Sequence, residues 1–156
     1  MAFFGSGEVR VALLGGVMLG LAAASWGSFA IPGAAVASET APARQFGLCH
    51  SGGGANCVVD GDTFWIDSGK VRIADIDAPE THPSRCAEEE RLGNAATLRL
   101  QALLNAGPVT LETGDRDTDQ YGRKLRVVTR GGRSLGGILV AEGLARGWTG
   151  RRQPWC

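Results

Sequence analysis

The sequence predicts an α+β domain, a five-stranded OB-type β-barrel with one long helix between strands 3 and 4 and a short C-terminal helix. Three observations lead to this prediction. Short β-prone runs alternate with glycine-rich turns, and 24 glycines in 156 residues favour a small β-rich fold over a helical bundle. A long stretch with apolar residues at helical spacing follows the third strand. A shorter helical stretch follows the fifth.

The first 37 residues have the composition of an export signal. An apolar run over 11–30 follows Arg10, and the Ala-Val-Ala sequence at 35–37 resembles a signal-peptidase cleavage site. A retained membrane anchor is the alternative, because the run is almost long enough to span a bilayer. Both interpretations place the folded part outside the cytoplasm, so we expect a periplasmic or secreted protein.

Four cysteines agree with export, because disulfides persist in oxidising compartments. They are Cys49, Cys57, Cys86 and Cys156. The sequence alone permits three pairings, of which the most economical joins Cys49 to Cys57 and Cys86 to Cys156. A zinc site made from Cys49, His50 and Cys57, with His82, is an alternative, although these spacings match no common zinc pattern.

The first three strands are expected after a polar lead-in and disulfide loop at 38–56, so that the folded domain covers 57–156. A strand begins at Cys57 and leads to Asp60. The runs 63–66 and 71–76 flank an Asp-Ser-Gly turn, which predicts an antiparallel hairpin.

The long helix is expected from Ser84, or a near neighbour acting as its cap, to about Asn105. Its leucines and alanines form one apolar stripe. The three glutamates at 88–90 point in different directions on a helix, so the sequence favours a solvated face over a metal site.

The last strands are expected at 109–113 and 124–129, separated by a polar loop. Ser134 is a candidate cap for a second helix over 135–142, with a glycine stop at Gly143. A basic, aromatic tail follows, which either stacks on bases or packs over the core.

Carboxylates gather at both ends of the predicted hairpin. Asp60 and Asp62 precede its first strand, while Asp75, Asp77 and Glu80 follow its second, so that folding returns all five to one rim. These acids repel one another unless they face solvent separately or bind a cation. Hard oxygen ligands suit calcium or magnesium better than zinc.

Arg72 and Arg123 are candidates to hold an anion beside that cation, which is the layout that phosphate chemistry needs. A guanidinium bonds two phosphate oxygens at once and keeps its charge. Tyr121 and Gly122 precede Arg123, and tyrosine can donate to a phosphate or stack on a base. Structural salt bridges to nearby aspartates are the alternative role of both arginines.

Three sequence blocks resemble the staphylococcal nuclease family. They are DGDT at 60–63, Arg72 followed by DAPE at 77–80, and DQYGR at 119–123. The resemblance covers roughly 57–148 and implies an OB-type domain. It also implies calcium-dependent hydrolysis of DNA or RNA with low sequence specificity, giving 3′-phosphate ends.

The family's functional residues carry over position by position. The resemblance implies Asp62, Asp77 and the backbone oxygen of Ala78 as calcium ligands, Arg72, Glu80 and Arg123 as catalytic residues, and Tyr121 as a substrate-binding residue. Glu80 would be the general base. Relatives often have threonine at position 78, but only the backbone oxygen coordinates there. Gln120 replaces a frequent lysine, which predicts weaker affinity for a terminal phosphate.

The formal net charge of zero excludes a uniformly basic coat for nucleic acid. Two rival functions remain at this point: a non-catalytic OB-type module that binds nucleic acid or another polyanion, and a disulfide-braced structural protein with an incidental calcium site. A module that only binds has no need of the complete set of charged site residues, so their presence together counts against the first rival; they are Asp62, Asp77, Glu80, Arg72 and Arg123. We expect a monomer with nucleic acid as its substrate and no stable protein partner.

Overall fold

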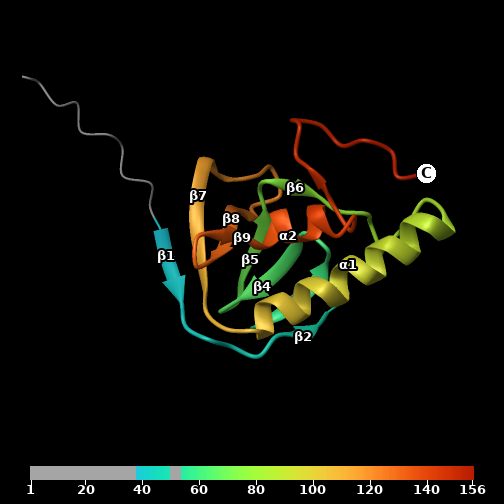
Figure 1. The fold of residues 1–156 in the computed structure, drawn as a ribbon. Coiled ribbons are helices and arrows are strands. Elements are labelled where there is room, and N and C mark those ends of the chain that lie inside the picture. Colours follow the sequence, from blue (N-terminus) through green and yellow to red (C-terminus); the bar gives the residue numbers. More distant parts are fainter. Residues whose placement is uncertain (1–37, 50–53) are drawn as a thin grey trace, which may run out of the picture. The chain divides into compact units, whose positions relative to one another are not determined.

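A computed structural model describes residues 38–49 and 54–156, so the expected signal segment at 1–37 lies outside the described residues, as does His50. Two helices lie in the described part, α1 (Ala87–Asn105) and α2 (Leu135–Ala141) (Figure 1). The strands are β1 (Ser38–Ala41), β2 (Gly47–Leu48), β3 (Cys57–Asp60), β4 (Thr63–Ile66), β5 (Gly69–Ile73), β6 (Ile76–Asp77), β7 (Val109–Thr118), β8 (Lys124–Arg130), β9 (Arg133–Ser134) and β10 (Arg146–Gly147).

Strands β3, β4 and β5 form the predicted antiparallel meander. The β4–β5 hairpin pairs Ile66 with Gly69, and the two residues between them, Asp67 and Ser68, both have positive φ angles of 49° and 64°. Two successive positive φ values are typical of the primed turns that match the twist of a hairpin. The predicted third strand divides into β5 and the short β6, with Ala74 and Asp75 between them.

The sheet is mixed and open. Its strand order is β1-β7-β8-β5-β4-β3-β2, with β5 parallel to β8 and β9 paired to β8. The α+β class is confirmed, but the expected closed five-stranded barrel is not what the strand pairings form. Strand β2 occupies the outer edge of β3 and β1 that of β7, so these edges are not free to pair with each other. Both added strands come from the predicted lead-in.

Helix α1 begins two residues later than the first candidate cap suggested. Cys86 is its N-cap, and no side chain caps the helix there. Its buried face carries Ala96, Leu100 and Leu104, the stripe that the helical spacing predicted. Leu100 and Leu104 pack with the strand residues into one hydrophobic core, and α1 lies against β3.

Helix α2 begins after the predicted cap and ends at Ala141, one residue before the predicted end, with Glu142 as its C-cap. The Ser134 hydroxyl accepts a hydrogen bond from Gly137 N at 2.9 Å, and Gly143 follows the helix with a φ of 73°. Strand β7 extends to Thr118, beyond the predicted strand end, because Thr118 pairs with Lys124 after an irregular stretch.

Disulfides join Cys49 to Cys57 and Cys86 to Cys156, which confirms the most economical pairing. The zinc alternative is wrong, because two of its proposed ligands are bonded to each other. The second bridge encloses 70 residues and contributes roughly 4 kcal/mol in the chain-entropy model. Within residues 38–49 and 54–156, none of the helices combines the length and apolarity that crossing a bilayer requires.

Candidate active site

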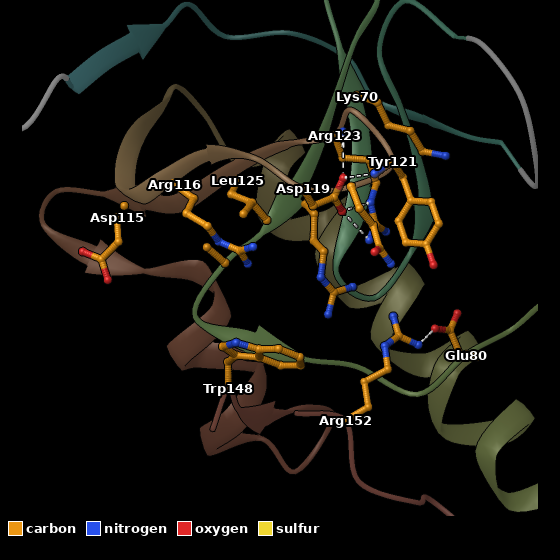
Figure 2. A pocket seen from close by; sticks show the side chains of 14 residues that line it. Lys70, Glu80, Asp115, Arg116, Asp119, Tyr121, Arg123, Leu125, Trp148 and Arg152 are labelled. Atoms are coloured by element: carbon orange, nitrogen blue, oxygen red, sulfur yellow. Dashed lines mark hydrogen bonds and ion pairs between the residues drawn. The ribbon is translucent and has the colours of Figure 1, made fainter. Parts of the chain in front are cut away.

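A cavity of about 970 Å³ opens beside β5, the connection from β7 to β8, and the C-terminal tail (Figure 2). Ionisable side chains dominate its lining. The basic ones are Lys70, Arg72, Arg116, Arg123 and Arg152, and the acidic ones are Glu80, Asp115 and Asp119. Five positive and three negative charges leave the cavity net positive, although the whole chain is neutral. The cavity therefore suits an anionic ligand.

Two aspartates from distant positions meet behind this cavity. Asp62 and Asp77 are both buried, and Arg72 lies between them with Nη1 2.6 Å from Asp62 Oδ1 and Nη2 3.5 Å from Asp77 Oδ1. The backbone N–H of Ala78 donates to Asp62 Oδ2 at 3.2 Å. The hairpin therefore returns these carboxylates to one place, as the sequence predicted.

The negative charge of this cluster is incompletely compensated. Burial, followed by repulsion from Asp62, raises the pKa of Asp60 to about 7, and burial is also the main cause that raises the pKa of Asp77. Asp77 Oδ1 is buried and accepts no hydrogen bond from the described residues. Arg72 Nη2 and Arg152 Nε lie 3.5 and 3.6 Å from this oxygen, close enough for ion pairs but too far for hydrogen bonds, so a bound cation would stabilise it further.

The donor set fits a hard divalent cation. Asp62 and Asp77 offer carboxylate oxygens, and the carbonyl of Ala78 directly follows Asp77 in the chain. Across the described ranges, no group of three or more His, Cys, Asp or Glu side chains is arranged to hold a metal ion. A site here would consequently combine two carboxylates with a backbone oxygen and water.

Glu80 lies beside this cluster and lines the cavity. Its side chain is paired with Arg152, whose Nη1 contacts Glu80 Oε1 (Figure 2). Its backbone N–H points to Glu89 Oε1 at 3.4 Å. Arg152 comes from the C-terminal tail, so the final segment of the chain completes the surroundings of the predicted base.

Glu89 corrects one prediction from the sequence. It is fully buried, whereas Glu88 and Glu90 are exposed, so only two of the three glutamates form the expected solvated face. The side chain of Glu89 accepts hydrogen bonds from the backbone and the guanidinium of Arg85 at 2.7 Å, and the guanidinium bonds lower the pKa of Glu89. Through these hydrogen bonds, the Glu89 carboxylate connects Arg85, in the segment before α1, to the first turn of the helix.

Asp119 orients Arg123 at the opposite side of the site. Its Oδ1 accepts the backbone N–H groups of Tyr121 and Arg123, and its Oδ2 accepts Arg123 Nε at 2.7 Å. Burial alone would raise the pKa of Asp119, but hydrogen bonds from Arg123 and Tyr121 lower it overall. Arg123 therefore does form the salt bridge that the sequence offered as an alternative role. The salt bridge leaves the guanidinium at the wall of the cavity, where it can still contact a ligand.

A short hydrogen-bonded chain connects the two halves of the site. Arg123 Nη1 donates to Thr63 Oγ1 at 3.4 Å, and Thr63 Oγ1 donates to Asp62 Oδ1 at 2.8 Å. Arg123 therefore faces the same site as the buried aspartates. Tyr121 is 74% exposed, and the Arg123 guanidinium lies 5.4 Å from the centre of its ring.

The prediction that all five carboxylates share one rim does not hold for Asp75, which contacts α2 instead. Asp75 accepts a hydrogen bond from Ser134 Oγ at 2.6 Å, and its carbonyl accepts the N–H of Trp148 at 2.9 Å. Asp75 therefore ties the start of α2 and the C-terminal tail to the hairpin. Asp60 makes a local turn through a 3.0 Å hydrogen bond from Asp62 N.

The three sequence blocks do not include every residue of the cavity. Lys70, Arg116, Trp148 and Arg152 also line it. Lys70 and Arg116 were not predicted as site residues, and Trp148 and Arg152 belong to the basic, aromatic tail, for which the sequence left base stacking and packing over the core open. The pairing of Cys86 with Cys156 was the signal that could have placed Arg152 near the start of α1.

The protein is an α+β domain in which carboxylates and guanidinium groups meet at one cavity. A site of this kind suits a phosphate ester, because the guanidinium groups can bind phosphate oxygens. The family model described as staphylococcal nuclease homologue matches residues 70–154, more than half of the sequence. The chain belongs to this family.

Two relatives from Bacillus subtilis (strain 168) are similar over 95 residues. Endonuclease YncB is 42% identical, and the match covers 56% of this chain and 44% of the relative. SPbeta prophage-derived endonuclease YokF is 41% identical, with 56% of this chain and 31% of the relative covered. The chain therefore spans less than half the length of either relative.

Proposed function

We propose that the protein is a secreted or periplasmic calcium-dependent nuclease that hydrolyses phosphodiester bonds of DNA or RNA. In this proposal it has low sequence specificity and leaves 3′-phosphate ends. One observation carries the proposal: buried Asp62 and Asp77 share Arg72, and Thr63 connects Asp62 to Arg123 at a net positive cavity. Membership of the family and the endonuclease names of two relatives support it.

Asp62, Asp77 and the carbonyl oxygen of Ala78 would hold the calcium ion. The oxygen of Asp77 that has no hydrogen-bond donor supports this assignment. When bound, calcium would polarise a phosphoryl oxygen and neutralise part of the charge that develops on it.

Arg72 and Arg123 are proposed to bind the phosphate. Each lines the cavity while a carboxylate fixes part of its fork, Asp62 for Arg72 and Asp119 for Arg123. Arg72 Nη2 is buried and makes no hydrogen bond within the described part of the chain, and its ion pair with Asp77 Oδ1 is long, at 3.5 Å, which leaves its N–H groups able to donate to a phosphate. Two fixed guanidinium groups would orient the phosphorus for attack and bind the extra charge of the transition state.

Glu80 is proposed as the general base that takes a proton from the attacking water. A base must be within reach of that water and not held by another group, so Glu80 must first separate from Arg152. Tyr121, which is exposed at the cavity, is proposed to donate to a terminal phosphate or stack on a base.

The test is hydrolysis of denatured DNA by the purified protein in calcium and in excess chelator. We expect cleavage only in calcium, and we expect Glu80→Gln to lower turnover by roughly 10²- to 10⁴-fold, as loss of a general base does. Glu88→Gln is the matched control, because Glu88 is exposed on α1 and pairs only with Arg91 among the described residues. Circular dichroism would verify that both variants fold.

Equal cleavage in chelator would contradict the calcium assignment, and a fully active Glu80→Gln would contradict the base assignment. Binding of DNA without cleavage in calcium would favour a non-catalytic polyanion-binding module instead. Analysis of the product ends by phosphatase treatment would check the 3′-phosphate prediction.

A further inference from the structure

We propose that the C-terminal tail, residues 148–156, is an autoinhibitory strap in which Arg152 competes with calcium for the carboxylate of Asp77 and occupies the carboxylate of Glu80, the proposed base. This inference rests on the proposed function, since it concerns access to the proposed cation and base. It assigns a role to a segment that the three sequence blocks do not include.

The strap is attached at both ends to residues that flank the carboxylates. At its start, β10 pairs with β6, so that Arg146 lies opposite Asp77, and Trp148 N donates to Asp75 O. At its end, Cys156 is bonded to Cys86, the residue that precedes α1. Figure 1 shows the tail leaving β10 and ending close to the start of α1. The strap therefore spans the segment that contains Glu80.

Arg152 uses this position to contact both proposed functional carboxylates. Its Nη1 is paired with Glu80 Oε1, and its Nε lies 3.6 Å from Asp77 Oδ1. That oxygen of Asp77 is the buried one without a hydrogen-bond donor. Figure 2 shows Arg152 extending from the tail to Glu80 at the margin of the cavity. A guanidinium thus provides the positive charge that this cluster requires.

Contacts between Arg146, which lies in β10 just before the strap, and the end of the strap restrict where Arg152 can go. Arg146 Nη1 donates to Pro154 O at 2.9 Å, and the Arg146 guanidinium stacks on Trp155 at 3.7 Å from the ring centre. These contacts, together with the disulfide, hold the tail as a closed loop. A tethered group has a high effective concentration at its target, so Arg152 is a strong competitor despite being 41% exposed.

Calcium and Arg152 exclude each other for two reasons. The same oxygens cannot coordinate a divalent ion while they bind a guanidinium, and two cations at a few ångströms repel. Calcium binding therefore requires Arg152 to move away, which also releases Glu80 to act on water. Loss of the Arg152 charge, or of the tether that holds it, should shift the population towards the calcium-binding state.

The experiment is a calcium titration by isothermal calorimetry on the full protein and three variants. Arg152→Gln should bind calcium roughly 5-fold more tightly, the equivalent of one partly exposed ion pair. Cys86→Ser/Cys156→Ser should also bind more tightly, because the strap is then attached at one end only. Arg151→Gln is the control, since it removes the same charge from the neighbouring exposed residue.

Unchanged or weaker calcium binding by Arg152→Gln would overturn the proposal that the tail is autoinhibitory. Weaker binding of inorganic phosphate with unchanged calcium affinity would instead make Arg152 part of the phosphate clamp, which also overturns it. If the double cysteine variant does not fold, the calcium affinity of Arg152→Gln still tests the proposal, because this variant keeps both disulfides.

The two proposals fail in different ways. Tighter calcium binding by Arg152→Gln without cleavage of DNA by any variant would refute the nuclease and leave the strap standing. Calcium-dependent cleavage with no effect of Arg152 on calcium affinity would refute the strap alone. Absence of calcium binding in every variant would overturn both.

Discussion

Asp119 illustrates how a single side chain can orient a functional group four residues further along the chain. Its carboxylate accepts two backbone N–H groups of the turn as well as Arg123 Nε. The turn is thereby closed around the base of the guanidinium. A shorter or neutral side chain at this position would leave Arg123 attached to the strand but without a defined direction.

We predict that Asp119→Asn lowers the free energy of unfolding by about 1 kcal/mol at pH 7, a low value because the cavity screens the pair. The pKa of Asp119 is lowered from its ordinary 3.8, so its stabilising contribution is complete above that value and is lost as pH falls through the folded pKa. The difference in unfolding free energy between wild type and variant should therefore be smaller at pH 3 than at pH 7. Urea denaturation at pH 7 and pH 3 measures it.

The control for this prediction is Asp115→Asn, which changes an exposed aspartate that lines the same cavity. We expect it to leave the unfolding free energy at neutral pH almost unchanged. A difference between wild type and Asp119→Asn that persists undiminished at pH 3 would show that the charge of Asp119 is not the cause.

At the scale of residues, motif spacing predicted that Asp62, Asp77 and Arg72 would meet, because a hairpin of known length returns its ends to one place. Motif spacing could not predict that Arg152 reaches this site, because its position depends on the disulfide between Cys86 and Cys156. Nor could it distinguish Glu89 from its neighbours, since burial of a charged helix residue depends on a partner such as Arg85. The functional roles of these residues stay predictions.

At the scale of elements, close packing of α1 sets the position of Glu80. A Cβ atom at Gly93 would lie 2.9 Å from the carbonyl oxygens of Pro79 and Glu80 and from Cγ2 of Thr81. Only a residue without a side chain allows the helix to approach that backbone so closely. The helix therefore acts as a support for the segment that carries the proposed base.

We predict that Gly93→Ala destabilises the protein by about 1–2 kcal/mol, because the clash outweighs the better helix propensity of alanine. It should also lower nuclease activity, because the backbone of Glu80 must shift. Chemical denaturation and cleavage of denatured DNA measure the two effects.

Gly137→Ala provides the comparison within a helix. Gly137 is exposed on α2, and its nearest neighbour would lie 3.5 Å from an added Cβ, an ordinary contact. We expect this variant to be as stable as wild type or up to about 1 kcal/mol more stable. If Gly93→Ala behaves in the same way, the packing argument is wrong.

The order and type of the principal elements could be predicted, because each has a local signal such as the apolar stripe of α1 or the cap at Ser134. The added strands β1 and β2 could not be predicted from local sequence pattern. Both are short and form only by hydrogen bonding to the edge of another strand. Strand β1 pairs with β7, which is distant in the sequence, and β2 pairs with β3, which follows it after a loop. Edge pairing of this kind also explains why the sheet is open.

At the scale of the whole molecule, a chain of zero net charge concentrates positive charge in one cavity while burying acids behind it. Net charge therefore gave no indication of the anion site, which depends on the local distribution of charge. The C-terminus belongs to this arrangement, because the Cys86–Cys156 bridge brings Arg152 to the acidic cluster. The site is thus assembled from the hairpin, the β7–β8 connection and the tail.

The central claim is that Asp62 and Asp77 bind a cation next to a phosphate held by Arg72 and Arg123. A crystal structure with calcium and a nucleoside 3′,5′-bisphosphate tests it most directly. We predict a calcium ion coordinated by both aspartates and the carbonyl of Ala78, a phosphate contacting both arginines, and Arg152 displaced from Glu80. Calcium bound away from these aspartates, or a phosphate that contacts neither arginine, would contradict the claim.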